Sequence, residues 1–162
     1  MELGENLSNA AVAIGQALGL KGLTSFDAII DETAVYLLEV NPRPGASLDV
    51  LDDDCGSLFR EHMAACLDQR LPLNALSSKI TKAINGPAKA MAILHADRGP
   101  IILNEIPWPD WSADRGSPGT FIPLGAPLAT ALAEAPTADA AEALARKRLA
   151  ELEDLIYGHA KS

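Results

Sequence analysis

The sequence predicts an α+β fold in which an antiparallel sheet with helices is followed by a small β-rich unit that ends in a helix. Three observations lead to this prediction. Apolar residues recur at helical spacing near both ends of the chain, short strand-like runs with turn signals lie between them, and proline and glycine crowd the second half. The composition changes after residue 70, so we expect two units, residues 1–70 and 71–162.

Size, composition and charge narrow the classes of function. The chain has 162 residues and 48% apolar side chains, which is enough to build a hydrophobic core. Acidic residues outnumber basic ones by 22 to 13, and the net charge of -9 argues against a nucleic-acid partner. No segment has the apolar length of a membrane span, and the start, MELGENLSNA, lacks a signal-peptide core. We therefore expect a cytoplasmic protein with neither a nucleic-acid nor a membrane partner.

The first unit begins with a predicted helix and a hairpin. The helix is expected over residues 5–18, where apolar residues recur at helical spacing before Gly19 and Gly22. Two strand-like runs follow, residues 25–30 and 34–40. The polar residues between these runs predict a tight connection, so the two strands should form an antiparallel hairpin.

Three aspartates, residues 52–54, precede a predicted helix over residues 55–69. Negative charge is favourable at a helix amino terminus, so we interpret these aspartates as a capping cluster, and their spacing fits no EF-hand loop. His62 and Cys66 are one turn apart, and we interpret them as a pair on the core side of the helix rather than a zinc site. Cys55 and Cys66 are too far apart along a helix for a disulfide, so we expect reduced thiols in or near a core.

The second unit is predicted to combine strands with one long helix. The strands are expected over residues 78–84, 88–95, 99–103 and 127–133. The helix is expected over residues 137–157, where Thr137 can cap its start and Gly158 its end. Its apolar stripe should pack on the strands.

Both tryptophans of the chain, Trp108 and Trp111, lie within a proline-rich loop of the second unit. Their rings could stack on a flat ligand, but flanking prolines favour a rigid loop whose rings plug the β-rich unit. Asp114 and Arg115 are expected to pin that loop.

The stretch LLEVNPRPG, residues 37–45, is the strongest sign of chemistry. Glu39 and Asn41 are two positions apart, so in a strand they share one face, and the hairpin could bring Asp27 beside them. Two carboxylates and an amide oxygen form a hard-oxygen site that suits Mg²⁺ or Mn²⁺. Arg43, fixed between two prolines, could hold a carboxylate or phosphate oxygen. The alternative is an edge strand with a solvated polar face and ordinary proline terminators.

These residues also carry a resemblance to a known family. The run GLKGLTSFDAIIDETAVYLLEVNPRPG resembles the end of the ATP-grasp catalytic domain, and its Asn-Pro-Arg-Pro-Gly exit is characteristic of carboxylate ligases in that superfamily. The later run IPWPDWSADRGSPGTFIPLGAPLATALA, followed by a helix, is similar to the small β-rich tail of carbamoyl-phosphate-synthase-like ATP-grasp ligases.

The resemblance implies roles for individual residues. Asp27, Glu39 and Asn41 would hold the Mg²⁺ or Mn²⁺ ions of bound ATP, with Asn41 and Arg43 belonging to the nucleotide and acyl-phosphate site. Arg43 would steady the acyl phosphate and is the catalytic candidate. In the family, ATP phosphorylates a carboxylate, and an amine then displaces phosphate. Catalysis of this kind rests on positioning and electrostatics rather than on a covalent protein intermediate.

The substrates themselves are less well indicated than the reaction. Small-molecule carboxylate and amine substrates are the implied partners, and Ser47 and Asp49, which follow the motif, are candidates for contacting them. The overall form resembles ligases linked to tetrahydromethanopterin biosynthesis.

The chain departs from the family pattern in what precedes the motif. The first 19 residues do not resemble a glycine-rich phosphate loop, phosphate-binding lysines or an adenine hinge, and no GxxxxGK loop occurs. We therefore expect the carboxy-terminal part of a longer, split or truncated ligase, inactive alone. Its expected partners are a missing amino-terminal ATP-binding half or a second copy, because severing a domain exposes apolar surface. The competing class is a non-catalytic relic of the fold that binds a small ligand or a partner protein.

Overall fold

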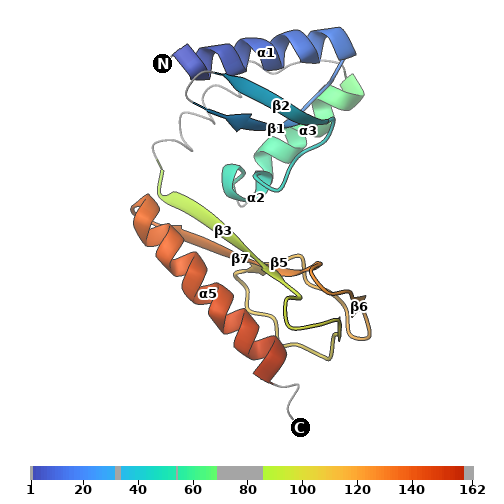
Figure 1. Ribbon diagram of the computed structural model, residues 1–162, viewed down its shortest axis with the longest axis vertical. Coiled ribbons are helices and arrows are strands. Elements are labelled where there is room, and N and C mark those ends of the chain that lie inside the picture. The colour runs from blue at the N-terminus through green and yellow to red at the C-terminus, as the bar shows by residue number, and fades with distance from the viewer. Residues whose placement is uncertain (1, 32–33, 54, 69–85, 159–162) are drawn as a thin grey trace. The chain divides into compact units, whose positions relative to one another are not determined.

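The computed structural model describes residues 2–31, 34–53, 55–68 and 86–158, and it confirms the predicted α+β fold (Figure 1). The chain divides into two compact units, which we call the amino-terminal unit (Met1–Thr81) and the carboxy-terminal unit (Lys82–Ser162). The predicted boundary after residue 70 and the predicted strand over residues 78–84 lie outside the described residues.

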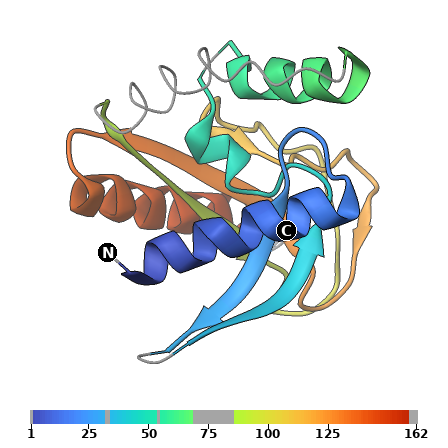
Figure 2. The same cartoon turned by 90° about the horizontal axis from the view of Figure 1, so that it is seen from above.

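The amino-terminal unit consists of helices around one hairpin. Its elements are α1 (Glu2–Leu18), β1 (Ser25–Ile30), β2 (Val35–Asn41), α2 (Leu48–Leu51) and α3 (Ser57–Asp68). The helix predicted over residues 5–18 is confirmed as α1, the helix predicted over residues 55–69 as α3, and the hairpin as β1 and β2, with small shifts of their ends. The one-turn helix α2 was not predicted. Helix α1 lies across the hairpin, as two perpendicular views show (Figures 1 and 2).

The hairpin contains a register shift that decides which side chains share a face. Ile30 pairs with Val35 and Ala28 with Leu37, but Asp27 pairs with Glu39. Leu38 is therefore an extra residue in β2, which is the definition of a β-bulge. Directly opposed residues of an antiparallel pair lie on the same face. The bulge therefore places the Glu39 side chain on the same face of the hairpin as Asp27.

The carboxy-terminal unit is built on a three-stranded antiparallel sheet of order β3-β7-β5. Its elements are β3 (Ala88–His95), β4 (Ile101–Ile102), β5 (Ser112–Ala113), β6 (Phe121–Ile122), β7 (Pro127–Ala135) and α5 (Ala138–Gly158). Strands β4 and β6 form a separate pair. The predictions of β3 and β7 are confirmed, the strand predicted over residues 99–103 is reduced to β4, and β5 and β6 were not predicted.

Helix α5 packs along β3 and β7, as predicted. The sheet offers it small side chains, because Ala92 pairs with Ala131 and Leu94 with Ala129. Ala129 and Ala131 belong to one buried cluster with Leu94 and with Leu152 and Ile156 of α5. Small residues let a helix approach a sheet closely and pack densely against it. The contact between α5 and the sheet is therefore part of the main buried cluster of the described residues. The predicted cap is also confirmed, since the Ala140 amide donates to Thr137 Oγ1 at 3.3 Å.

The tryptophan loop plugs this core as predicted. Trp108 and Trp111 pack against the buried cluster. The Arg115 guanidinium donates to the carbonyls of Ser112 at 2.9 Å and Pro109 at 3.0 Å, and Asp114 accepts a hydrogen bond from buried Thr130 at 2.6 Å. Asp114 has φ of 54°, a left-handed conformation that aspartate tolerates better than most residues. These bonds hold the loop against the sheet.

The expectation that both cysteines lie in or near a core is wrong, because Cys55 and Cys66 are free and exposed. His62 accepts a hydrogen bond from the Leu23 amide at 3.0 Å, and Cys66 Sγ lies 3.9 Å from the imidazole nitrogens. A Cβ on Gly22 would lie 2.4 Å from His62 Nδ1, so this glycine lets the turn dock on α3. The His62–Cys66 side of α3 therefore faces a turn instead of a core.

Candidate functional site

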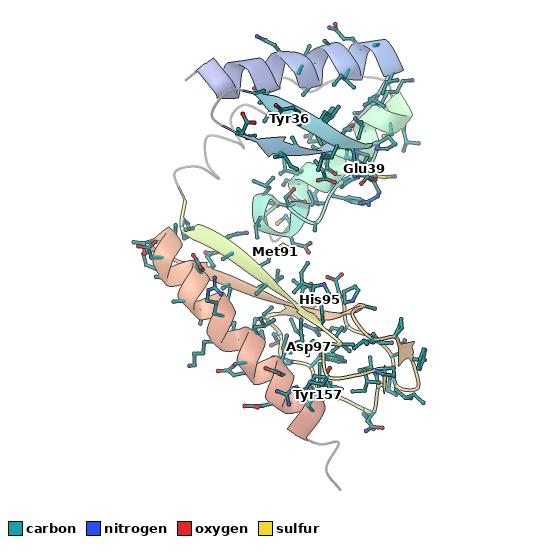
Figure 3. The ribbon with its side chains drawn as sticks, viewed as in Figure 1. Tyr36, Glu39, Met91, His95, Asp97 and Tyr157 are labelled. Atoms are coloured by element: carbon teal, nitrogen blue, oxygen red, sulfur yellow. The ribbon has the colours of Figure 1, made fainter. Side chains whose placement is uncertain are left out.

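Asp27 and Glu39 are brought together by the hairpin. The two residues are directly opposed across β1 and β2, and both are exposed. Ser25 pairs with Asn41 two positions away, so all four side chains lie on one face. Asn41 Nδ2 donates to Asp27 Oδ2 at 3.3 Å. Figure 3 shows Glu39 on the hairpin of the amino-terminal unit.

The β-bulge is the structural cause of this arrangement. If the register from Ile30 to Ala28 continued regularly, Asp27 would oppose Leu38, and Glu39 would lie on the opposite face from Asp27. The extra residue moves Glu39 onto the face of Asp27. Bulges often redirect a side chain beside a functional site, and this bulge creates a pair of carboxylates that a regular hairpin would separate.

The carboxylate pair works against the stability of the hairpin. Like charges directly opposite each other in an antiparallel pair are destabilising, by roughly a few tenths of a kcal/mol at an exposed position. The hydrogen bond from Asn41 offsets part of the repulsion on the Asp27 side. A cation between the two carboxylates would remove the repulsion, because it would supply the missing positive charge.

The residues present partly match what a magnesium ion needs. Mg²⁺ is commonly held by one or two carboxylates with waters and substrate phosphates, and Asp27 with Glu39 supply two carboxylates. The Asn41 side chain presents its nitrogen to Asp27, so its amide must turn by half a rotation before the oxygen can serve as a ligand. Nowhere in the described ranges do three His, Cys, Asp or Glu side chains gather at one point. The donor set therefore fits a partly hydrated ion and not a closed protein cage.

The loop that follows β2 folds back on β1. The Arg43 amide donates to the Asn41 carbonyl at 2.7 Å, and the Ser25 hydroxyl donates to the Arg43 carbonyl at 3.3 Å. A Cβ on Gly45 would lie 2.6 Å from Ser25 Oγ, so glycine is required for this close approach. The exposed Arg43 guanidinium donates to the Pro44 carbonyl at 3.1 Å. Arg43 is thus anchored through its backbone, and its side chain lies at the surface.

An apolar hollow of about 400 Å³ lies within the amino-terminal unit, and the sequence did not indicate it. Its lining comes from α1, the segment before β1, β1 itself, the loop after β2, α2 and α3: Leu7, Ser8, Ala11, Leu23, Thr24, Ser25, Phe26, Pro44, Gly45, Ser47, Leu48, Leu51 and Leu58. Ser47, a predicted substrate contact, is among these residues, whereas Asp49 is an exposed residue in the first turn of α2. Residues so dispersed along the chain leave no local pattern by which a sequence could reveal the hollow.

The carboxy-terminal unit holds one titratable group in an unusual setting. The Tyr157 hydroxyl is buried and makes no hydrogen bond of ordinary geometry in the described part of the chain, although the Arg98 backbone lies beside it. Burial raises the pKa of Tyr157 above its ordinary value of 10.0, and the nearby Asp97 carboxylate raises it further (Figure 3). The Arg98 guanidinium lies 4.9 Å from the ring centroid and pairs with Glu153. A phenol that stays neutral in this way is suited to packing rather than to acid–base chemistry.

No protein-family model, curated protein or solved structure matches this chain. None of the described helices combines the length and the apolar character needed to cross a membrane.

Proposed function

We propose that this chain is the carboxy-terminal part of an ATP-grasp ligase that activates a carboxylate as an acyl phosphate and joins it to an amine. The observation that carries the proposal is the opposition of Asp27 and Glu39, which a β-bulge places on one face with Asn41 beside them. A hairpin that was merely solvated on this face would gain stability by separating its two carboxylates. Retaining a destabilising pair is typical of functional sites.

Each residue of the site has a defined task in the proposed reaction. Asp27 and Glu39, and Asn41 once its amide has turned, would hold the Mg²⁺ or Mn²⁺ that accompanies ATP, and the ion would supply positive charge to the phosphate oxygens. Arg43 follows Asn41 by two residues in the chain. Its planar guanidinium is suited to binding the oxygens of an acyl phosphate.

The substrate carboxylate attacks the terminal phosphorus of ATP and ADP leaves, which gives the acyl phosphate. The neutral amine then attacks the acyl carbon, the bond from that carbon to the phosphate oxygen breaks, phosphate leaves with the bonding electrons, and the amine nitrogen releases a proton to solvent.

The proposal assigns the remaining parts of the active site to another polypeptide segment. The contacts to the adenine and to the phosphate chain would come from an amino-terminal ATP-binding half, and the complete enzyme would act in the cytoplasm. The chain by itself would bind a divalent cation weakly and would not catalyse ligation.

Manganese titration of the full chain, followed by nuclear magnetic resonance, tests the metal site. We expect Mn²⁺ to broaden the amide signals of β1 and β2 around Asp27 and Glu39, because a paramagnetic ion broadens nearby nuclei. The isosteric variants D27N and E39Q should both lose this broadening. E105Q, which removes an exposed carboxylate from the carboxy-terminal unit, is the matched control and should retain it.

The same variants separate a metal site from a structural role of the carboxylates. Without metal, E39Q should leave the hairpin as stable as the wild type or slightly more stable, because it removes like-charge repulsion. Broadening that survives in both D27N and E39Q would refute the proposed ligands. If D27N and E39Q lose the broadening and also lose the spread of amide chemical shifts in the hairpin, the carboxylates are needed only to fold the hairpin.

Calorimetric titration with ATP in the presence of Mg²⁺ tests the claim that the chain is one part of a ligase. We expect no heat of nucleotide binding, since the proposed adenine and phosphate contacts lie elsewhere. Clear binding that both D27A and E39A abolish would mean that this chain holds a self-sufficient nucleotide site, contrary to the proposal.

A non-catalytic role in binding a partner is the second candidate, and the exposed apolar side chains of the hairpin favour it. Ile29, Ile30 and Leu38 are all more than half exposed. If Mn²⁺ broadens no amide signals of the wild-type hairpin, the partner-binding role is favoured over the ligase.

A further inference from the structure

The apolar hollow of the amino-terminal unit adjoins the candidate metal site. Ser25 belongs to both, because it lines the hollow and pairs with Asn41 across the hairpin. The Cα atoms of directly opposed residues in an antiparallel pair are about 4.5–5.5 Å apart. A molecule in the hollow at Ser25 would therefore lie within the length of a side chain from Asn41.

The loop after β2 lines one part of the hollow and carries a cation beside it. Pro44, Gly45 and Ser47 belong to the lining. The Arg43 guanidinium donates to the Pro44 carbonyl at 3.1 Å, so its positive charge lies next to a lining residue. The Ser25 hydroxyl holds the Arg43 carbonyl at 3.3 Å and fixes the loop at this place. A guanidinium beside an apolar hollow is suited to a ligand that joins an anionic group to an apolar body.

The lining determines what the body of such a ligand can be. None of the lining residues, all of which lie in the described part of the chain, carries a charge. Leucines from three helices contribute to it, namely Leu7 of α1, Leu48 and Leu51 of α2, and Leu58 of α3. A charged group placed among these side chains would lose its hydration without gaining a partner. The body of the ligand is therefore uncharged and largely apolar.

The size of the hollow favours a small molecule over a protein partner. Its volume is about 400 Å³. Small-molecule pockets typically have about 300–1,000 Å³, and an apolar cavity of about 150 Å³ already holds a benzene ring. A stable protein interface takes about 20–30 residues from each side. Thirteen residues line the hollow, which is too few for such an interface.

We propose that the hollow binds the body of the acid that the ligase activates, and that this substrate is an apolar monocarboxylic acid. Two lining hydroxyls lie at the end near Arg43, since a Cβ on Gly45 would be 2.6 Å from Ser25 Oγ and 3.8 Å from Ser47 Oγ. The carboxylate of the acid points to this polar end, and its apolar body lies among the leucines. That the bound acid is a substrate rests on the proposed ligase function, whereas its binding requires neither metal nor nucleotide.

Titration of the full chain with cyclohexanecarboxylate, followed by nuclear magnetic resonance without metal or nucleotide, tests the inference. We expect saturable shifts of the amide signals of Leu23, Phe26 and Leu48, which line the hollow. The neutral analogue cyclohexanecarboxamide should bind at least about threefold more weakly, because it lacks the charge that Arg43 recognises. Succinate, which carries a second carboxylate in place of an apolar body, should cause no saturable shift at these amides.

Two alanines of α1 provide a matched pair of variants. A11F places a ring in the lining and should abolish the shifts that the acid causes. A13F makes the same change at an exposed alanine of the same helix outside the lining, and it should leave binding unchanged. Circular dichroism of both variants checks that α1 is retained.

The variant R43Q tests recognition of the carboxylate and lies in an exposed loop, so it does not depend on filling the hollow. It should reduce the preference for the acid over the carboxamide to near one, while the shifts caused by the carboxamide stay the same. Retention of the full preference in R43Q would refute the role of the guanidinium.

Absence of saturable shifts with the wild-type chain would overturn the inference. Equal affinity for the acid and the carboxamide, or binding of succinate as tight as that of the acid, would overturn the proposed substrate class. Equal loss in A11F and A13F would place the binding outside the hollow and would also overturn it. Acid binding without manganese broadening would support the acid site and refute the metal site, whereas broadening without acid binding would overturn this inference alone.

Discussion

The two units of this protein are stabilised in different ways. Among the residues that the structure describes, all but one of the buried apolar residues lie in the carboxy-terminal unit, and the exception is Ala65 of α3. Most of the exposed large apolar side chains lie in the amino-terminal unit, from Val12 of α1 to Leu67 of α3. In its described part, the unit that carries the candidate site thus has little core of its own.

Local polar bonds hold the amino-terminal unit together in place of a core. The Asp52 carboxylate accepts the amides of Leu58 at 2.7 Å and Phe59 at 3.1 Å, at the start of α3. His62 holds the Leu23 amide, and Ser25 holds the Arg43 carbonyl. Single bonds of this kind contribute about 1 kcal/mol each, much less than a packed core. The comparison teaches that the candidate site lies on a scaffold that needs further surface to become rigid.

Removing a core side chain should give the largest difference between the units. Leu152 is fully buried in α5, so L152A should lower the free energy of unfolding by about 2–5 kcal/mol. L67A, at a residue 73% exposed in α3, should change it by less than about 0.5 kcal/mol. Urea unfolding followed by tryptophan fluorescence reports the carboxy-terminal unit, because both tryptophans lie there, and circular dichroism reports the helices of both units.

If L152A does not fold, the milder I156V tests the same comparison, with an expected loss of about 0.5–1.5 kcal/mol. Equal losses from a core variant and from L67A would contradict the difference between the units.

Two arginines of α5 should differ in their contribution to the free energy of unfolding, because they differ in their contacts with the sheet. The Arg148 guanidinium donates to the Leu132 carbonyl at 2.6 Å and lies 5.1 Å from the centre of the Trp111 ring. R148M should cost about 1–2 kcal/mol, since it leaves that carbonyl without a charged donor. R146M removes only an exposed pair with Glu142, which should cost about 0.3–0.5 kcal/mol. Urea unfolding of both variants measures the difference, and similar losses would show that Arg148 adds nothing beyond a surface charge.

Removing the Asp52 carboxylate should have a local effect in the amino-terminal unit. D52A leaves the Leu58 and Phe59 amides without their acceptor, so α3 should lose about 1 kcal/mol of local stability. Hydrogen exchange should then be faster at the first turn of α3 and unchanged in α5. D139A, which removes an exposed acid from the first turn of α5, is the control and should leave exchange in α3 unchanged. Slow exchange in α3 of D52A would mean that packing, and not the cap, holds this helix.

Elements with strong local signals could be predicted from the sequence. The hairpin follows from two apolar runs around a polar turn, and α5 follows from its apolar stripe with a threonine cap. Strands β5 and β6 have two residues each and exist through pairing with distant partners, which leaves no local pattern. The exposure of Cys66 was mispredicted for a related reason. Helical spacing shows which residues share a side of α3, but not whether anything covers that side.

The sequence indicated which residues would form the candidate site, but it did not indicate the β-bulge that brings them to one face. The spacing of Asp27 and Glu39 around the turn indicated that they would lie near each other. A regular hairpin would nevertheless have put them on opposite faces, and the bulge at Leu38 that unites them has no signature in the residue types alone. The surface position of the Arg43 side chain likewise depends on its own loop geometry.

The smallest expected effect compares the two tyrosines, one in each unit. The pKa of Tyr157 is raised by burial, so ionisation is less favourable in the folded state than in the unfolded state. Stability from this residue is therefore fully present below its ordinary pKa of 10.0 and is lost as the pH rises through the raised value. In a Y36F background, the ultraviolet absorbance of phenolate should report Tyr157 alone and should appear at higher pH in the folded chain than in urea.

The variant Y157F sharpens this last comparison. It removes a buried hydroxyl that makes no hydrogen bond of ordinary geometry, so at neutral pH it should change the free energy of unfolding by less than about 1 kcal/mol. At alkaline pH it should lose less stability than the wild type. Y36F, at an exposed ring, should lose as much stability as the wild type over the same range. A parallel decline of Y157F and wild type would show that Tyr157 ionises as freely in the folded protein as in water, and that the core of this unit does not shield its phenol.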